Sequence, residues 1–181
     1  QYALDGFVVL APDVFWRDAP RVELGYVGED RERALALMKA LPADGARADL
    51  QTALSALQAR PECTGPVAAL GYCMGGRLAF NAATLPGVRA AVAYYGGGIQ
   101  NQLALAPQVG CPMQFHYAGI DAAIPPEAVA AVQAAMAGKP AEFHLYEGAQ
   151  HGFNCWARAA HQPAAAALAH GRTLQFLSAL F

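Results

Sequence analysis

Short apolar runs alternate with segments of helical periodicity along this chain, and the alternation restricts the fold more than any other feature of the sequence. The run at residues 66–72 is apolar almost throughout, which is typical of a strand buried on both faces. Residues 29–41 carry apolar side chains at helical spacing behind an acidic start. The alternation predicts an α/β fold, a mostly parallel sheet with helices on both faces. The predicted strands are 6–11, 66–72, 88–95, 112–118 and 141–146, and the predicted helices are 29–41, 49–60, 75–85, 125–137 and 163–180.

Composition limits the class of protein. The chain has 181 residues, of which 55% are hydrophobic and 14% charged, so we expect one folded domain over residues 1–181. A net charge of -2 without a basic tract argues against nucleic acid as a partner. No apolar run approaches the roughly 18 residues of a membrane span, and no signal peptide is evident. Because the chain starts almost directly in a strand-like segment, we expect the domain to be incomplete at its N-terminus.

The cysteines indicate reduced thiols. The chain has 4 cysteines, widely spaced and without a Cys-x-x-Cys pair: Cys63, Cys73, Cys111 and Cys155. A disulfide framework is unusual in a core-rich chain of this size. A cytoplasmic protein fits this pattern best, although a periplasmic location stays open.

The segment that carries chemistry is Gly71-Tyr72-Cys73-Met74-Gly75-Gly76, between a predicted strand and a predicted helix. It matches the Gly-x-nucleophile-x-Gly turn, in which the nucleophile has strained backbone angles and small residues must flank it. The helix that follows offers free N–H groups and a positive dipole end, which favour a thiolate. Cys73 is therefore the candidate nucleophile, and the Met74 N–H the candidate oxyanion donor. The alternative is a buried, unreactive cysteine in a glycine-rich turn.

An acid and a histidine follow in the order that such a nucleophile requires. Asp121 comes just beyond the strand predicted at 112–118, and His151 just beyond the strand predicted at 141–146. Open α/β sheets place their sites at these carboxyl ends of strands. We expect His151 to act as base on Cys73, with Asp121 orienting the imidazole. Taken singly, Asp121 could be a helix-capping residue and His151 a polar loop residue.

Other polar residues fit the pattern less well. Asp13 also ends a predicted strand, but it precedes the nucleophile. His151 and Cys155 lie four apart without a second pair at zinc spacing, so we expect no metal site. The Gly96-Gly97-Gly98 run lacks the Lys-Ser/Thr ending of a phosphate loop, and no cofactor is expected. The remaining histidines read as core or surface residues: His116, His144, His161 and His170.

Together with residues 11–17, 94–96, 119–121 and 151–153, the cysteine turn resembles the dienelactone hydrolase (carboxymethylenebutenolidase) family over essentially the whole chain. The resemblance implies an α/β-hydrolase fold and a Cys73–His151–Asp121 triad. Its implied activity is opening of an unsaturated lactone to maleylacetate during chlorocatechol breakdown. We expect a monomer or homodimer that acts on a small-molecule ester or lactone. Arg17 matches an arginine that in the family binds the substrate carboxylate, which suits a guanidinium fork. Tyr94 and Tyr95 are expected to line the pocket, with core packing as their alternative.

The sequence departs from the family pattern in two places. The family's second substrate arginine, four residues after the histidine, is replaced here by Cys155, and Arg158 is near but not equivalent. The family also has strands before residue 6, with a glutamate that contacts the resting cysteine and part of the oxyanion hole. These departures keep two other functions open besides a thiol hydrolase. One is a non-catalytic ligand-binding domain, and the other is a thiol redox sensor using Cys73, with Cys155 as a partner.

Overall fold

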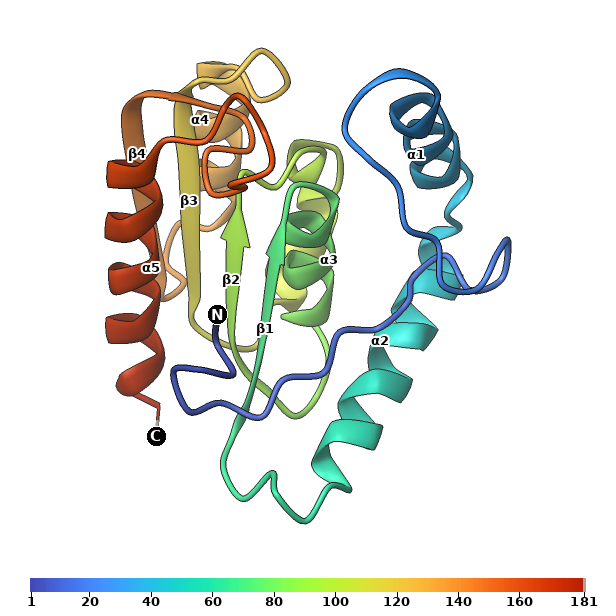
Figure 1. Ribbon diagram of the computed structural model, residues 1–181. Helices are drawn as coiled ribbons and strands as arrows, with labels where there is room; N and C mark the ends of the chain where they lie inside the picture. Colours follow the sequence, from blue (N-terminus) through green and yellow to red (C-terminus); the bar gives the residue numbers. More distant parts are fainter. Residues whose placement is uncertain (181) are drawn as a thin grey trace. The chain divides into compact units, whose positions relative to one another are not determined.

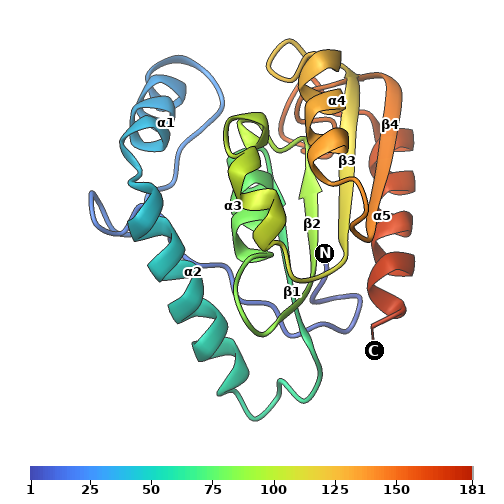
Figure 2. The same ribbon diagram turned by 180° about the vertical axis from the view of Figure 1, so that it is seen from behind.

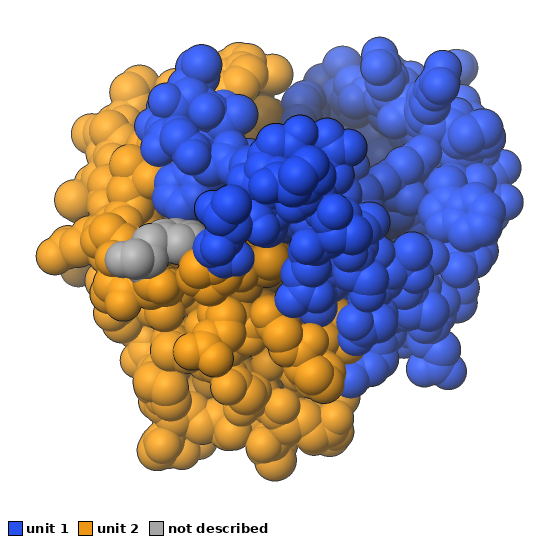
Figure 3. All heavy atoms as spheres, turned by 90° about the horizontal axis from the view of Figure 1, so that it is seen from below, with its two compact units in different colours: residues 1–65 blue, residues 66–181 orange. Residues whose placement is uncertain are grey.

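A computed structural model describes residues 1–180. The chain divides into two compact units, residues 1–65 and residues 66–181, which Figure 3 colours separately. That one domain covers residues 1–181 stays a prediction. The helices are α1 (Gly28–Ala40), α2 (Ala43–Gln58), α3 (Met74–Ala82), α4 (Pro126–Ala135) and α5 (Pro163–Ser178). The strands are β1 (Val67–Tyr72), β2 (Val88–Tyr94), β3 (Met113–Ile120) and β4 (Ala141–Gln150), and two short 3-10 turns are η1 (Ile99–Asn101) and η2 (Leu103–Gln108).

The second unit is built on a 4-stranded sheet in the order β1-β2-β3-β4, with every neighbouring pair parallel. Helices α3 and α4 cover one face of this sheet and α5 covers the other (Figures 1 and 2). Because the strands are parallel, their carboxyl ends lie at the same end of the sheet. Cys73, Asp121 and His151 directly follow β1, β3 and β4 and therefore lie at this end. The predicted α/β sheet with helices on both faces is confirmed.

The first unit contains α1 and α2, which the break at Leu41 and Pro42 separates into two helices. The helix predicted from residue 49 starts earlier, at Ala43, where Asp44 lies in the first turn and complements the helix dipole. The strand predicted at residues 6–11 is wrong. This segment has no ladder hydrogen bonds, and Val9 is 57% exposed. A strand is stabilised by pairing, and residues 6–11 pair with no strand among the residues described.

A buried polar cluster lies between the sheet and α5. His116 on β3 is fully buried, and its ring bonds to Tyr146 Oη at 2.8 Å and to Thr173 Oγ1 at 3.0 Å. Burial, and then the nearby His144 and Arg172 charges, lower the pKa of His116 to about 3, so its ring stays neutral. The core placement predicted for His116 is confirmed. Along the described chain, no helix has both the length and the apolar character needed to cross a membrane.

Candidate active site

Cys73 occupies a strained turn between β1 and α3. Its backbone has φ 54 and ψ -116, a conformation that L-residues rarely adopt. The Cys73 N–H donates to the Tyr94 carbonyl at 2.9 Å, and the Cys73 carbonyl accepts from the Gly76 N–H at 3.0 Å. These bonds tie the turn to β2 and start the helix. The Cys73 side chain therefore lies at the carboxyl end of β1 and at the N-terminus of α3.

Glycine is required on one side of this turn for a steric reason. A Cβ on Gly71 would lie 1.9 Å from the Gly75 carbonyl oxygen, so no larger residue fits without moving the backbone. A Cβ on Gly75 itself would meet nothing within 4 Å. The second close approach is instead made by Gly76, whose Cβ would lie 2.8 Å from the Tyr94 carbonyl oxygen. The prediction that Gly75 must be small is wrong. The residue of α3 that has to be small is Gly76, because α3 packs closely against β2 at that position.

We expect Gly71→Ala to destabilise the protein by about 3 kcal/mol or more, because the added methyl group would overlap fixed backbone atoms. Gly75→Ala is the matched control, since its methyl group enters open space on a helix that favours alanine. Urea unfolding of both variants gives the two free energies of unfolding. Equal stabilities for Gly71→Ala and Gly75→Ala would contradict the packing described for this turn.

Asp121 and His151 form the second part of the site. His151 Nδ1 lies 2.7 Å from Asp121 Oδ2. The other carboxylate oxygen, Oδ1, accepts the N–H groups of Ala123 at 2.8 Å and Ile124 at 3.2 Å. The Asp121 side chain is only 1% exposed, and both of its carboxylate oxygens have hydrogen-bond partners. This arrangement fixes the plane of the imidazole and presents its second nitrogen to Cys73.

The electrostatics favour a charged pair of Cys73 and His151. Burial alone would raise the pKa of the Cys73 thiol. The hydrogen bond and charge of His151, the Met74 N–H and the Arg158 charge outweigh it, so that the pKa lies below its usual value. Burial lowers the pKa of His151, but its bonds to Asp121 and Cys73 raise it overall to about 9. At neutral pH His151 is therefore protonated, and its charge favours the thiolate form of Cys73.

The two tyrosines predicted to line the pocket differ. Tyr94 is fully buried, stacks on His116 with ring centroids 4.3 Å apart, and bonds through its hydroxyl to Thr173 Oγ1 at 2.7 Å. These are the contacts of a core residue, the alternative that the sequence left open. Tyr95 belongs to the site, because its ring centroid lies 5.0 Å from that of His151.

Arg17, the predicted carboxylate ligand, lies in the first unit. Its guanidinium stacks on Trp16 at 4.6 Å and forms a two-pronged ion pair with Asp49, in which Nη2 bonds to Oδ1 at 2.9 Å. The Arg17 side chain is 40% exposed. Nothing in the sequence pattern pointed to Asp49, which lies on α2, as its partner.

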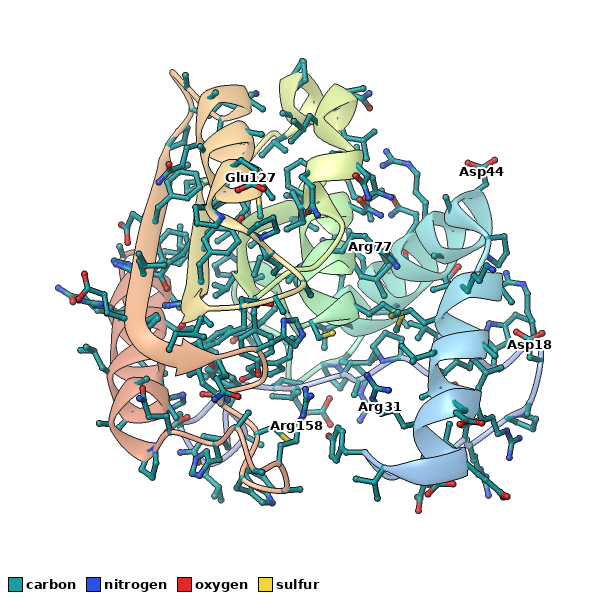
Figure 4. All side chains as sticks on the ribbon, turned by 90° about the horizontal axis from the view of Figure 1, so that it is seen from above. Asp18, Arg31, Asp44, Arg77, Glu127 and Arg158 are labelled. Atoms are coloured by element: carbon teal, nitrogen blue, oxygen red, sulfur yellow. The ribbon has the colours of Figure 1, made fainter. Side chains whose placement is uncertain are left out.

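Arg158 lies on the loop between β4 and α5 and is labelled in Figure 4. Its guanidinium packs on Gly152, since a Cβ there would meet Arg158 Nη1 at 2.5 Å. Gly152 has φ +87 and directly follows His151. The positive charge of Arg158 therefore acts on Cys73 and lowers the pKa of its thiol. The number of residues between His151 and Arg158 did not indicate this effect. Among residues 1–180, no group of His, Cys, Asp and Glu side chains is arranged to hold a metal ion.

Comparison with known proteins shows the family of the chain. The model of the dienelactone hydrolase family matches residues 1–181. The chain belongs to this family. The carboxymethylenebutenolidase of Pseudomonas putida is 35% identical over 177 residues, covering 97% of the chain and 75% of that relative. Carboxymethylenebutenolidase 1 of Cupriavidus pinatubonensis is 33% identical over the same shares of the two chains.

Solved structures of dienelactone hydrolases have the same fold. A candidate dienelactone hydrolase from Klebsiella pneumoniae superposes with a TM-score of 0.77 at 25% identity, covering 92% of this chain and 73% of that one. The dienelactone hydrolase of Anabaena variabilis superposes with a TM-score of 0.62 at 19% identity, covering 84% and 68%. The predicted dienelactone hydrolase family and α/β-hydrolase fold are therefore confirmed, and the protein is a hydrolase of this family.

Proposed function

We propose that the protein is a thiol hydrolase that opens a lactone, or cleaves a small carboxylate-bearing ester, through an acyl-enzyme on Cys73. The observation that carries this proposal is the position of His151, which bonds to Asp121 with one nitrogen and faces the Cys73 thiol with the other. A thiolate at a helix N-terminus, paired with an oriented imidazolium, is an activated nucleophile.

In the first half of the reaction, the Cys73 thiolate attacks the carbonyl carbon. A carbon–sulfur bond forms, and the carbonyl electron pair moves to the oxygen, where the Met74 N–H at the start of α3 donates to it. Collapse of this intermediate breaks the bond to the ester oxygen, which takes the proton from the His151 imidazolium. The product is a thioester on Cys73. In a lactone, the released hydroxyl group stays attached to the acyl chain.

In the second half, water hydrolyses the thioester. Neutral His151 takes a proton from the water as its oxygen attacks the thioester carbon. The carbon–sulfur bond then breaks, the electron pair returns to sulfur, and the product leaves as a carboxylic acid, which loses its remaining proton to the solvent. The site regains its thiolate and imidazolium. Asp121 keeps the imidazole in one orientation and stabilises its charge in both halves.

Positive charge supports a substrate that bears a carboxylate. Arg17 is the residue that the resemblance assigns to that carboxylate. Arg158 adds a positive charge that acts on Cys73. The names of the relatives, carboxymethylenebutenolidases, fit the same class of substrate. A reduced nucleophile suits the cytoplasm, where we propose that the protein acts as a monomer or homodimer.

The proposal is tested by hydrolysis of p-nitrophenyl acetate and a dienelactone before and after treatment with iodoacetamide at a series of pH values. We expect both activities to disappear in step with alkylation of Cys73. Because the Cys73 pKa is lowered, the thiolate is present on the acid side of the roughly 8.5 of an ordinary thiol, and inactivation should already be fast there. Cys111 is the internal control, since burial raises its pKa to about 11 and it should stay unmodified.

Two results would contradict the proposal. The first is turnover that survives complete alkylation of Cys73. The second is absence of turnover on both esters by a protein whose Cys73 is intact and reacts with iodoacetamide. The second result would favour a ligand-binding domain without hydrolytic chemistry.

A further inference from the structure

Tyr95 has an unusual backbone for its residue type. In the part of the chain described, only three residues other than glycine have a positive φ: Arg21, Cys73 and Tyr95. At Tyr95, φ is 36. Bulky side chains rarely adopt this region, and such strain persists only where the surroundings hold the residue in place. The Tyr95 N–H donates to the His116 carbonyl at 2.7 Å, which holds the backbone at the end of β2.

Tyr95 is 3% exposed, and its ring lies beside the loop that carries His151. Its ring centroid lies 5.0 Å from that of His151 and 5.2 Å from that of Phe153, which is fully buried. Its hydroxyl oxygen accepts the backbone N–H of Asn154. Tyr95 thus contacts three of the four residues from His151 to Asn154.

The bonds of the loop itself act on its backbone rather than on the His151 ring. Gly152, with φ +87, turns the chain immediately after His151, and the Gln162 N–H at the N-cap of α5 donates to the Phe153 carbonyl at 3.0 Å. Asp121 fixes one nitrogen of the ring. The buried ring of Tyr95, tilted by 60° to the imidazole, is a second, independent restraint on it.

We infer that Tyr95 is a positioning residue, whose ring and hydroxyl clamp residues 151–154 and thereby hold the His151 imidazole against Cys73. The inference rests on the proposed function of His151 and Cys73, and it assigns Tyr95 a role other than the lining of a substrate pocket. Burial raises the pKa of the Tyr95 hydroxyl, so it stays protonated at neutral pH and takes no proton in the reaction.

The test is Tyr95→Phe, which keeps the ring and removes only the acceptor of the Asn154 N–H. Tyr117→Phe is the matched control, because Tyr117 is 2% exposed and its hydroxyl has no hydrogen-bond partner among the described residues. Three quantities are measured for the full chain: kcat and KM for p-nitrophenyl acetate, and the pH dependence of Cys73 alkylation by iodoacetamide without substrate. Thermal unfolding shows that both variants are folded.

For Tyr95→Phe we expect kcat to fall about tenfold with KM within about twofold of wild type. The apparent pKa for alkylation of Cys73 should move upward, because a less well-held imidazolium stabilises the thiolate less. Tyr117→Phe should match wild type in all three quantities. A raised KM with an unchanged alkylation profile would overturn the inference and make Tyr95 a pocket-lining residue, and no change in any quantity would overturn it as well.

The two proposals fail separately. Persistent turnover by Cys73→Ala would remove the proposed function. The alkylation profile follows the reactivity of the thiol rather than turnover, so it still reports whether Tyr95 positions His151.

Discussion

Replacing Cys73 with alanine is expected to lower kcat/KM for p-nitrophenyl acetate and for a dienelactone by at least about 10³-fold. The thiolate supplies the electron pair that attacks the carbonyl, and no other group described at the turn between β1 and α3 can form the acyl-enzyme. Alanine adopts the backbone conformation of this turn no less easily than cysteine, so the loss should be chemical. Steady-state kinetics with an unfolding curve for each variant separates activity from stability.

Cys73→Ser is the companion variant. Serine keeps the shape of the turn, but its hydroxyl does not ionise beside His151 as a thiol does. We expect its activity to lie between those of Cys73→Ala and wild type. Full activity in Cys73→Ala would contradict the assignment of the nucleophile.

Asp121→Asn is expected to lower kcat by about 10²–10⁴-fold with the fold preserved. The carboxylate serves two sets of donors: Oδ1 accepts the N–H groups of Ala123 and Ile124, and Oδ2 faces His151 Nδ1. An asparagine has one acceptor oxygen, so either the loop or the imidazole loses its partner. If the oxygen stays with the loop, an NH₂ group faces Nδ1 and favours the wrong tautomer of His151. The measurement is kcat against pH, beside the free energy of unfolding.

Asp13→Asn is the control for this experiment. Asp13 is the other aspartate at the end of an apolar segment, and its carboxylate accepts the N–H groups of Phe15 at 3.0 Å and Arg21 at 2.8 Å. The substitution removes the same negative charge from an aspartate of the first unit that, like Asp121, accepts two backbone N–H groups. Activity should stay within about twofold of wild type, given that surface substitutions usually have small effects. A larger loss of kcat in Asp13→Asn than in Asp121→Asn would contradict the assignment of the acid.

The sheet was predictable because its central strands, β2 and β3, are buried on both faces. The runs that became β1 and β2 are almost wholly apolar, and the helices α3 and α4 follow β1 and β3, which favours a parallel sheet. Residues 6–11 have the same local character but no pairing. Apolar content shows that a segment can form a strand, whereas ladder hydrogen bonds depend on a neighbour that local sequence does not specify.

The order of Cys73, Asp121 and His151 was also visible in the sequence, because each residue directly follows a recognisable strand. Contacts that depend on side-chain direction were not. Tyr94 and Tyr95 are adjacent and of one type, yet Tyr94 enters the polar cluster with Thr173 and Tyr95 turns to His151. The change to positive φ at Tyr95 redirects its side chain, and nothing in the sequence marks that change.

The position of Arg158 could not be predicted from sequence spacing either. The turn at Gly152 and the backbone bonds from Cys155 N–H to the Gly152 carbonyl and from Arg158 N–H to the Cys155 carbonyl fold the loop back on itself. Sequence spacing from His151 placed Cys155, rather than Arg158, at the matching position. The folded loop nevertheless brings the Arg158 guanidinium onto Gly152, where its charge lowers the pKa of the Cys73 thiol against the effect of burial.

The central claim is a covalent acyl-enzyme on Cys73, and the most direct measurement is to trap it. The protein is mixed with p-nitrophenyl acetate, quenched in acid during the first turnover, digested and analysed by mass spectrometry. We expect one acetyl group on the peptide that contains Cys73, and none on the same peptide of Cys73→Ala. Turnover without an adduct on Cys73, at a rate that Cys73→Ala reproduces, would contradict the account.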